Sequence, residues 1–155
     1  MKNVLIVFAL FVSAVGFSQY DEDASNLNWL TDYDEAKEIS LKEKKPILVY
    51  FTGSDWCSPC KMLKKDFFST PEFEERASNM VLLMVDMPRR TDIITKEQKK
   101  KNELMVQMYN RTGSYPNLVA LNAKGSIIGE LNGYTMLRET NRHFAFVDSV
   151  LENYL

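Results

Sequence analysis

The sequence predicts an α/β fold in which helices cover both faces of a central mixed β-sheet. Three apolar, strand-like runs, at residues 47–52, 80–86 and 118–121, are separated by segments of helical pattern. The third run is followed by a turn at 122–125 and a further strand at 126–131, which indicates a hairpin. Helices that alternate with strands, together with one hairpin, call for a mixed sheet with helices on its two faces.

Local signals predict the helices between these strands. Residues 31–42 begin with acidic side chains and end with lysines, the charge order that the helix dipole favours. Helical patterns also occur at 61–68, from residue 103 and at 135–154. A capping sequence at 69–72 predicts the start of a further, short helix. In the helix from residue 103 we expect an apolar stripe made of Leu104, Met105 and Met108.

The N-terminal end of the sequence indicates export. Lys2 is followed by an uncharged apolar run at 4–15 and then by small residues, the pattern of a secretory signal peptide. We therefore divide the chain into a signal peptide at 1–18, a polar lead-in at 19–30 and a single domain at 31–155. The apolar run is short for a membrane span, and an uncleaved anchor is the alternative. Export predicts a periplasmic, oxidising location.

Composition narrows the classes of function. A chain of 155 residues suits one domain that buries its own core. A formal net charge of −2 gives no reason to expect nucleic acid or an acidic membrane as a partner. No segment is typical of dimerisation, so we expect a monomer.

Two cysteines carry the most specific chemical signal. Cys57 and Cys60 are the only cysteines, and they lie between the strand at 47–52 and the next helix. Unpaired N–H groups and the helix dipole favour a thiolate at the helix start, so we expect Cys57 to be an exposed nucleophile. Cys60, one turn later and deeper, can then attack the mixed disulfide and release the product. Pro59, beside Ser58, fits the first helical turn and stiffens the ring.

Other uses of a cysteine pair fit this sequence less well. A zinc site needs four ligands, and the chain adds only one histidine, His143. A c-type haem site needs a histidine directly after the second cysteine, where Lys61 stands. A purely structural disulfide stays open, although so small a ring would stabilise the fold only modestly. We expect no metal and no cofactor beyond the cysteine pair itself.

The neighbours of the cysteines each have two interpretations. Trp56 either shields one side of the pair or is an ordinary core aromatic. Lys61 and Lys64 place positive charge near the thiols, but lysines on a helix are usually solvated.

The strand, the run Trp-Cys-Ser-Pro-Cys-Lys at 56–61, the helix after it and a proline that opens a later hairpin together resemble the thioredoxin superfamily. The chain is most similar to exported bacterial thioredoxin-like proteins related to the C-terminal domain of the membrane reductase DsbD. These share the Asp-Trp-Cys approach and the segment 67–73. The resemblance implies a thioredoxin-like fold, a cis bond before Pro116, and a substrate groove made by Trp56, Tyr115 and Pro116.

Three features depart from the family pattern. Many thioredoxins carry a buried Asp in the strand before the motif, but here Tyr50 occupies that position, and Asp55 in the loop is a candidate substitute. Asn117 stands where a threonine is common. The lysine-rich stretch 88–101 lengthens one connection. These departures bear on rate, redox poise and choice of partner.

The resemblance implies a thiol–disulfide oxidoreductase of the cell envelope that exchanges a Cys57–Cys60 disulfide with protein thiols or disulfides. It favours a reductase recharged by a membrane electron donor, with an oxidase or isomerase as the next choice. A hypothesis from another class is a redox-inactive chaperone or adaptor that docks through 88–101. The missing buried acid supports this alternative.

Overall fold

The computed structural model of the chain describes residues 27–154. The expected signal peptide and most of the expected lead-in therefore lie outside the described residues. The elements in chain order are β1 (Trp29–Leu30), α1 (Tyr33–Glu43), β2 (Ile47–Thr52), α2 (Ser58–Leu63), the π-helical η1 (Lys64–Phe68), α3 (Pro71–Ala77), β3 (Val81–Asp86), α4 (Lys96–Tyr109), β4 (Asn117–Leu121), β5 (Ile127–Asn132) and α5 (Asn141–Tyr154).

The sheet is mixed, as predicted. Its strand order is β1-β3-β2-β4-β5, in which the first three strands are parallel and β4 and β5 are antiparallel to their neighbours. Trp29 and Leu30, at the end of the expected lead-in, form the short edge strand β1 opposite Leu82 and Leu83. These two residues are too short a run to be predicted as a strand from the sequence.

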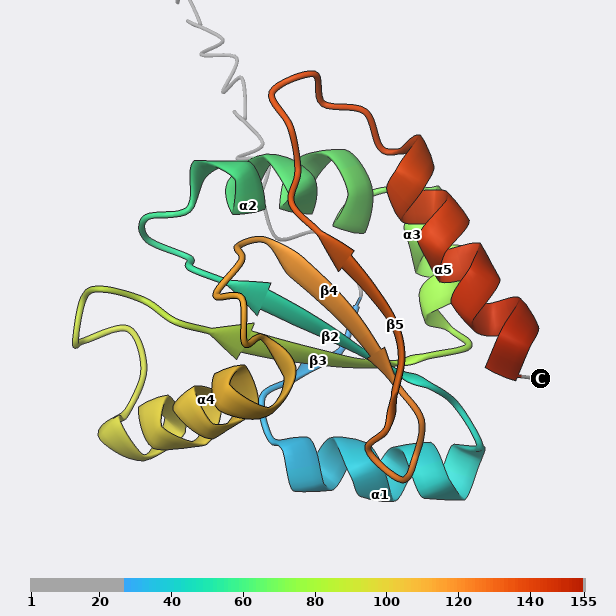
Figure 1. The fold of residues 1–155 in the computed structure, drawn as a ribbon, viewed down its shortest axis with the longest axis horizontal. Helices are drawn as coiled ribbons and strands as arrows, with labels where there is room; N and C mark the ends of the chain where they lie inside the picture. Colours follow the sequence, from blue (N-terminus) through green and yellow to red (C-terminus); the bar gives the residue numbers. More distant parts are fainter. Residues whose placement is uncertain (1–26, 155) are drawn as a thin grey trace, which may run out of the picture.

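Helices cover both faces of this sheet, which makes three layers. Figure 1 shows α1 and α4 on one side of the strands and α2, α3 and α5 on the other. Alternation along the fully buried β2 divides the core between the two sides. Leu48 and Tyr50 belong to the cluster that contains both cysteines, whereas Ile47, Val49 and Phe51 belong to the opposite cluster.

Helix α4 begins seven residues before the predicted start. Thr95 caps it, because its hydroxyl accepts a hydrogen bond from the Gln98 backbone N–H at 3.1 Å. The predicted apolar stripe is wrong in part: Met105 is buried, but Leu104 and Met108 are exposed. Asn102 is buried instead and donates to the Asp86 carbonyl at 2.7 Å. This polar contact sets which side of the helix faces the sheet.

Helix α5 begins at Asn141, so the predicted start at residue 135 is wrong. The loop before it is held by Asp66 of η1. The Tyr134 hydroxyl donates to Asp66 at 2.7 Å, and the Arg138 guanidinium forms an ion pair with the same carboxylate. Arg138 also has a φ of 57°, which an α-helix does not allow. The loop therefore stays non-helical up to Thr140, whose carbonyl accepts the first helical N–H groups.

The segment predicted as one helix at 61–68 contains two kinds of turn. Helix α2 starts earlier, at Ser58, and widens into η1. Phe67 and Phe68 of η1 are both buried in the cluster around the cysteines.

None of the helices within 27–154 is at once long and apolar enough to span a bilayer.

Candidate active site

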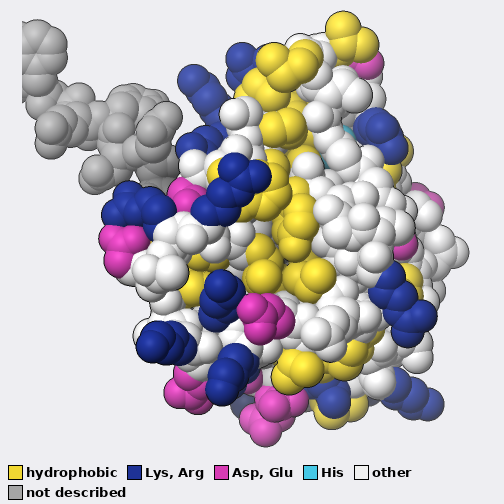
Figure 2. Space-filling model, turned by 60° about the vertical axis from the view of Figure 1, so that its left-hand side comes forward, with side chains coloured by type: hydrophobic (Ala, Val, Ile, Leu, Met, Phe, Trp, Pro, Cys, Tyr) yellow, Lys and Arg dark blue, Asp and Glu magenta, His cyan; other side chains and the backbone are white. Residues whose placement is uncertain are grey.

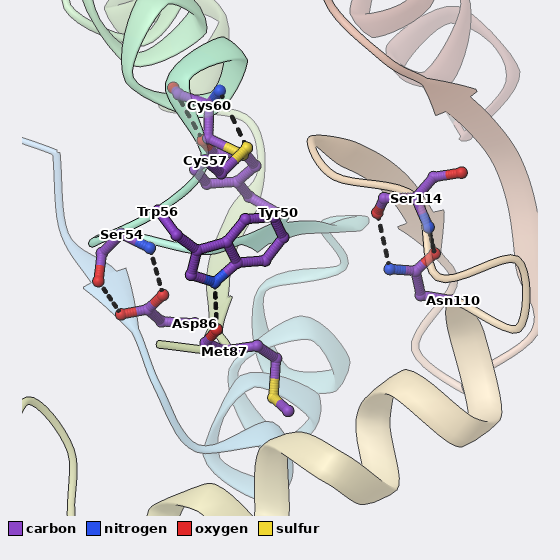
Figure 3. The surroundings of a disulfide bond; sticks show 9 residues. All are labelled: Tyr50, Ser54, Trp56, Cys57, Cys60, Asp86, Met87, Asn110 and Ser114. Atoms are coloured by element: carbon purple, nitrogen blue, oxygen red, sulfur yellow. Dashed lines mark hydrogen bonds between the residues drawn. A yellow bond between two sulfur atoms is a disulfide. The ribbon is translucent and has the colours of Figure 1, made fainter. Parts of the chain in front are cut away.

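The cysteine pair lies at the start of α2, after the carboxyl end of β2. Cys57 is the N-cap of α2, and its sulfur accepts a hydrogen bond from the Cys60 backbone N–H at 3.2 Å. The two residues form a disulfide, with their Cα atoms 5.3 Å apart (Figure 3). Pro59 lies in the first turn, and Ser58 is exposed. The predicted placement of the pair at a strand-to-helix junction is confirmed.

Both cysteines are buried in this oxidised form. Cys57 is 3% exposed and Cys60 is 1% exposed, so the expectation of an exposed Cys57 is wrong for the disulfide state. Trp56 and Tyr115 pack against the same cluster as the two cysteines. The two aromatic side chains thus share one cluster with the cysteine pair.

The turn that leads into Cys57 is fixed from two directions. The Gly53 carbonyl accepts from the backbone N–H groups of Trp56 at 3.2 Å and Cys57 at 2.8 Å. From β3, the Asp86 carboxylate accepts from the backbone N–H of Ser54 at 2.8 Å and from its hydroxyl at 2.6 Å. A side chain at Gly53 would overlap the Trp56 indole, so glycine is required here.

Trp56 links the cysteine loop to two other segments. Its Nε1 donates to the Met87 carbonyl at 2.8 Å, as Figure 3 shows. Its ring meets Tyr115 edge to face, with centroids 5.3 Å apart. The Arg89 guanidinium lies 4.8 Å from the centroid of the indole. The half-buried ring packs against the core cluster that contains the cysteines. Trp56 is therefore a core aromatic that also lies next to the cysteine pair.

The peptide bond between Tyr115 and Pro116 is cis. Tyr115 is half-buried and Pro116 is buried. The Pro116 carbonyl accepts from the Gly133 backbone N–H at 2.9 Å, which ties this loop to the end of β5. The structure therefore brings Trp56 and Tyr115 together, and Pro116 is the residue after Tyr115.

Two buried asparagines support the Tyr115–Pro116 loop. Asn110 donates to the Ser114 carbonyl at 2.9 Å and accepts from the Ser114 backbone N–H at 3.2 Å. Asn117 donates to Asn110 and to Glu130, both at 3.0 Å. Sequence reasoning missed Asn110, and an asparagine directly after a helical pattern is the signal that could have drawn attention to it.

Tyr50 is the residue that we expect at the position of the acid of many thioredoxins. Its hydroxyl is buried and donates to the Cys60 carbonyl at 3.1 Å. Burial raises the pKa of the Tyr50 phenol well above its usual value, so the phenol stays neutral. At this position the protein therefore has a hydrogen-bond donor and not a base.

The carboxylate of Asp55, the candidate substitute for the acid, is bound to the loop after β3. Its carboxylate accepts from the backbone N–H of Arg89 at 3.0 and 3.2 Å and from that of Arg90 at 3.0 Å. Partial desolvation raises the pKa of Asp55, but these N–H groups and the Arg89 charge outweigh it and hold the pKa below its usual value. Asp55 thus fixes the loop after β3.

The remaining charged and polar candidates lie outside the reacting pair. Lys61 and Lys64 are exposed on the helix that carries the cysteines. His143 is buried against Phe67 and Tyr134, as an ordinary helix residue. Within 27–154, no group of three His, Cys, Asp or Glu side chains is arranged to hold a metal ion.

A disulfide at the start of a helix that follows a parallel strand is the arrangement of a thiol–disulfide exchange site in a thioredoxin-like fold. The family model described as thioredoxin-like matches residues 28–123, and the chain belongs to this family. Its two cysteines form the C-x-x-C pair of the thiol–disulfide oxidoreductases in this fold.

Named relatives agree with this assignment. The chain is 35% identical over 109 residues to the disulfide bond reductase DsbH of Chlamydia pneumoniae. The aligned region covers 70% of this chain and 64% of DsbH. It is 28% identical over 136 residues to the thioredoxin-related protein DsbJ of the same organism, covering 76% of this chain and 39% of DsbJ. The chain thus spans less than two thirds of the length of these relatives. A solved structure of a DsbH oxidoreductase matches with a TM-score of 0.70 and 30% identity, over 83% of this chain and 87% of that one.

Proposed function

We propose that this chain reduces protein disulfides in the cell envelope through Cys57 and Cys60. The observation that carries the proposal is the position of Cys57, whose sulfur caps α2 and accepts the Cys60 backbone N–H. A thiolate at this position is stabilised by that N–H group and by the helix dipole, which makes Cys57 the attacking sulfur.

The reducing cycle begins from the dithiol form. The Cys57 thiolate attacks one sulfur of a substrate disulfide, and a Cys57–substrate disulfide forms while the other substrate sulfur leaves as a thiolate and takes up a proton. Cys60 then loses its proton and attacks the Cys57 sulfur, which releases the second substrate thiol. Two electrons pass to the substrate, and the Cys57–Cys60 disulfide seen here is the oxidised product.

Residues around the cysteine pair support both the binding of the substrate and the attack by Cys60. Trp56 and Tyr115 border the pair and form, with Pro116, the groove in which we place the substrate peptide. The neutral Tyr50 phenol holds the Cys60 carbonyl, so that Cys60 stays in reach of the Cys57 sulfur. Ser58 and Lys61 are exposed at the helix start and can face an approaching protein.

Direction and location follow from two further observations. The relative DsbH is named a disulfide bond reductase, which favours the reducing direction for this chain. Residues 1–18 have the pattern of a signal peptide, which favours the cell envelope. An oxidised pair must be reduced again after each turnover, and we assign this step to a dithiol of a membrane electron donor.

Trapping of partners tests the assigned roles. Cys60→Ser should accumulate proteins as mixed disulfides on Cys57, because the resolving attack is missing. Cys57→Ser should trap none, because the attacking thiolate is missing. Non-reducing gel electrophoresis and mass spectrometry of envelope extracts would show these adducts.

Two outcomes would contradict the proposal. Equal adducts on both variants would mean that the roles of the two cysteines are wrongly assigned. A reduced wild-type protein that exchanges with no model disulfide would favour the chaperone or adaptor hypothesis.

A further inference from the structure

An arginine lies directly beside the proposed substrate groove. The Arg89 guanidinium lies over the Trp56 ring, 4.8 Å from its centroid, and Trp56 in turn contacts Tyr115. Trp56 is the residue directly before Cys57. A cationic group thus borders the path that a substrate disulfide must take to Cys57.

The backbone holds Arg89 in this place. Its N–H donates to both oxygens of the Asp55 carboxylate, and the preceding loop is fixed by the hydrogen bond from Trp56 to the Met87 carbonyl. Asp55 and Trp56 both belong to the turn that leads into Cys57. These hydrogen bonds tie the loop after β3, which carries Arg89, to the turn after β2, which carries the reacting sulfur.

Among residues 27–154 the Arg89 guanidinium forms no ion pair, in contrast to its neighbour, although its charge acts on the Asp55 carboxylate. Arg90 is exposed and forms an ion pair with Asp92, with Nε donating to Oδ1 at 3.0 Å. Arg89 is also exposed, and no carboxylate lies within ion-pair distance of its guanidinium among residues 27–154. Stacking on an indole leaves the N–H donors at the edge of the guanidinium available to a carboxylate.

The end of the molecule that carries the loops after β2 and β3 combines apolar and basic groups. The loops after β2 and β3 lie at one end of the molecule in Figure 1, and that end faces forward in Figure 2. Figure 2 shows a band of hydrophobic side chains with Lys and Arg side chains beside it, among which some Asp and Glu side chains also lie. This combination suits a peptide that has apolar residues near its cysteine and an acidic residue on one side.

We propose that Arg89 is a specificity residue that binds a carboxylate on the substrate protein, next to the cysteine that Cys57 attacks. The inference rests on the proposed oxidoreductase function and adds to it a substrate class, namely disulfides flanked by an acidic side chain. A single exposed ion pair of this kind gives a preference of about threefold.

Two synthetic disulfide peptides that differ only in Glu or Gln beside the cysteine test this inference. The readout is the ratio of kcat/KM for the Glu peptide to kcat/KM for the Gln peptide, at low salt. The same peptides reacted with dithiothreitol give their intrinsic ratio. The wild type should prefer the Glu peptide about threefold over this intrinsic ratio. Arg89→Gln should lose the preference, and the matched control Arg90→Gln should keep it.

Each other outcome has a definite meaning. A wild type that reduces both peptides in the intrinsic ratio, or an Arg89→Gln variant that keeps the preference, overturns the inference and leaves the oxidoreductase function intact. An equal loss in Arg90→Gln would assign the preference to general positive charge and overturn the role of Arg89. A wild type that reduces neither peptide nor a small uncharged disulfide overturns the proposed function and the inference together.

Discussion

Tyr50 places a neutral phenol against the backbone of Cys60. The phenol reaches the Cys60 carbonyl, and burial keeps it protonated, so it can orient the resolving cysteine but cannot accept its proton. Water or the leaving substrate thiolate must then take up the Cys60 proton. The family resemblance predicted a position for Tyr50 in the strand before the cysteines. The bonding partner of its hydroxyl depends on how α2 packs, which a strand pattern does not contain.

His143 makes the stability of the protein depend on pH. It is the only histidine in the chain, it is 1% exposed, and its Nδ1 has no hydrogen-bond partner within the described residues. Burial, together with the charge of Arg142, lowers the pKa of His143 from 6.5 to about 4. The unfolded chain therefore binds a proton below pH 6.5 that the folded chain does not bind. Stability is complete above this pH and falls as the pH falls toward 4.

We expect the free energy of unfolding of the oxidised protein to fall by about 2 kcal/mol between pH 7 and pH 5. Urea denaturation at the two pH values measures this change. His143→Gln should flatten the dependence, whatever its effect on absolute stability. An unchanged slope in the variant would show that other groups cause the dependence.

At the scale of elements, the lysine-rich stretch divides into two parts with different roles. Residues 88–95 form a loop that Asp55 holds beside Trp56, and residues from Lys96 onward form α4. Hydrophobic periodicity could not predict the first turns of α4, because their side chains are almost all polar. The capping threonine, Thr95, was the available signal. In the same way, the contacts of Tyr134 and Arg138 with Asp66, which delay α5, join segments far apart in sequence.

The lysines of α4 differ in their contacts, which gives a test of their role. Lys101 pairs with Asp32, the N-cap of α1, at 2.7 Å, whereas Lys99 and Lys100 are exposed. Lys101→Gln should lower the urea midpoint slightly at low salt, and this difference should vanish at high salt because screening removes it. Lys99→Gln and Lys100→Gln serve as controls and should leave the midpoint unchanged. A salt-independent loss in Lys101→Gln would contradict the ion-pair account.

None of the three lysine substitutions should change turnover of a small uncharged disulfide. These side chains lie on the helix and not in the turn that carries the cysteines. A collapse of small-disulfide turnover would place α4 in the active site.

At the scale of the whole molecule, the site is assembled from three loops at one end of the sheet. The loop after β2 brings the cysteines, the loop after β3 brings Met87 and Arg89, and the loop before β4 brings Tyr115 and Pro116. The cysteines could be predicted from their C-x-x-C spacing, and Tyr115 and Pro116 from the family resemblance. Asp86, Asn110 and Arg89 could not, because their contacts exist only once β2, β3 and β4 lie side by side.

The central claim is that the Cys57–Cys60 disulfide opens and closes in the folded protein and does so as a reductant. Equilibration with dithiol and glutathione buffers of known potential, followed by thiol labelling and mass spectrometry, measures this most directly. The account predicts a reversible two-electron transition at a strongly negative potential, near the value of about −270 mV for thioredoxin. A pair that stays bonded in excess dithiol, or a midpoint near the value of about −120 mV typical of a strong oxidant, would contradict it.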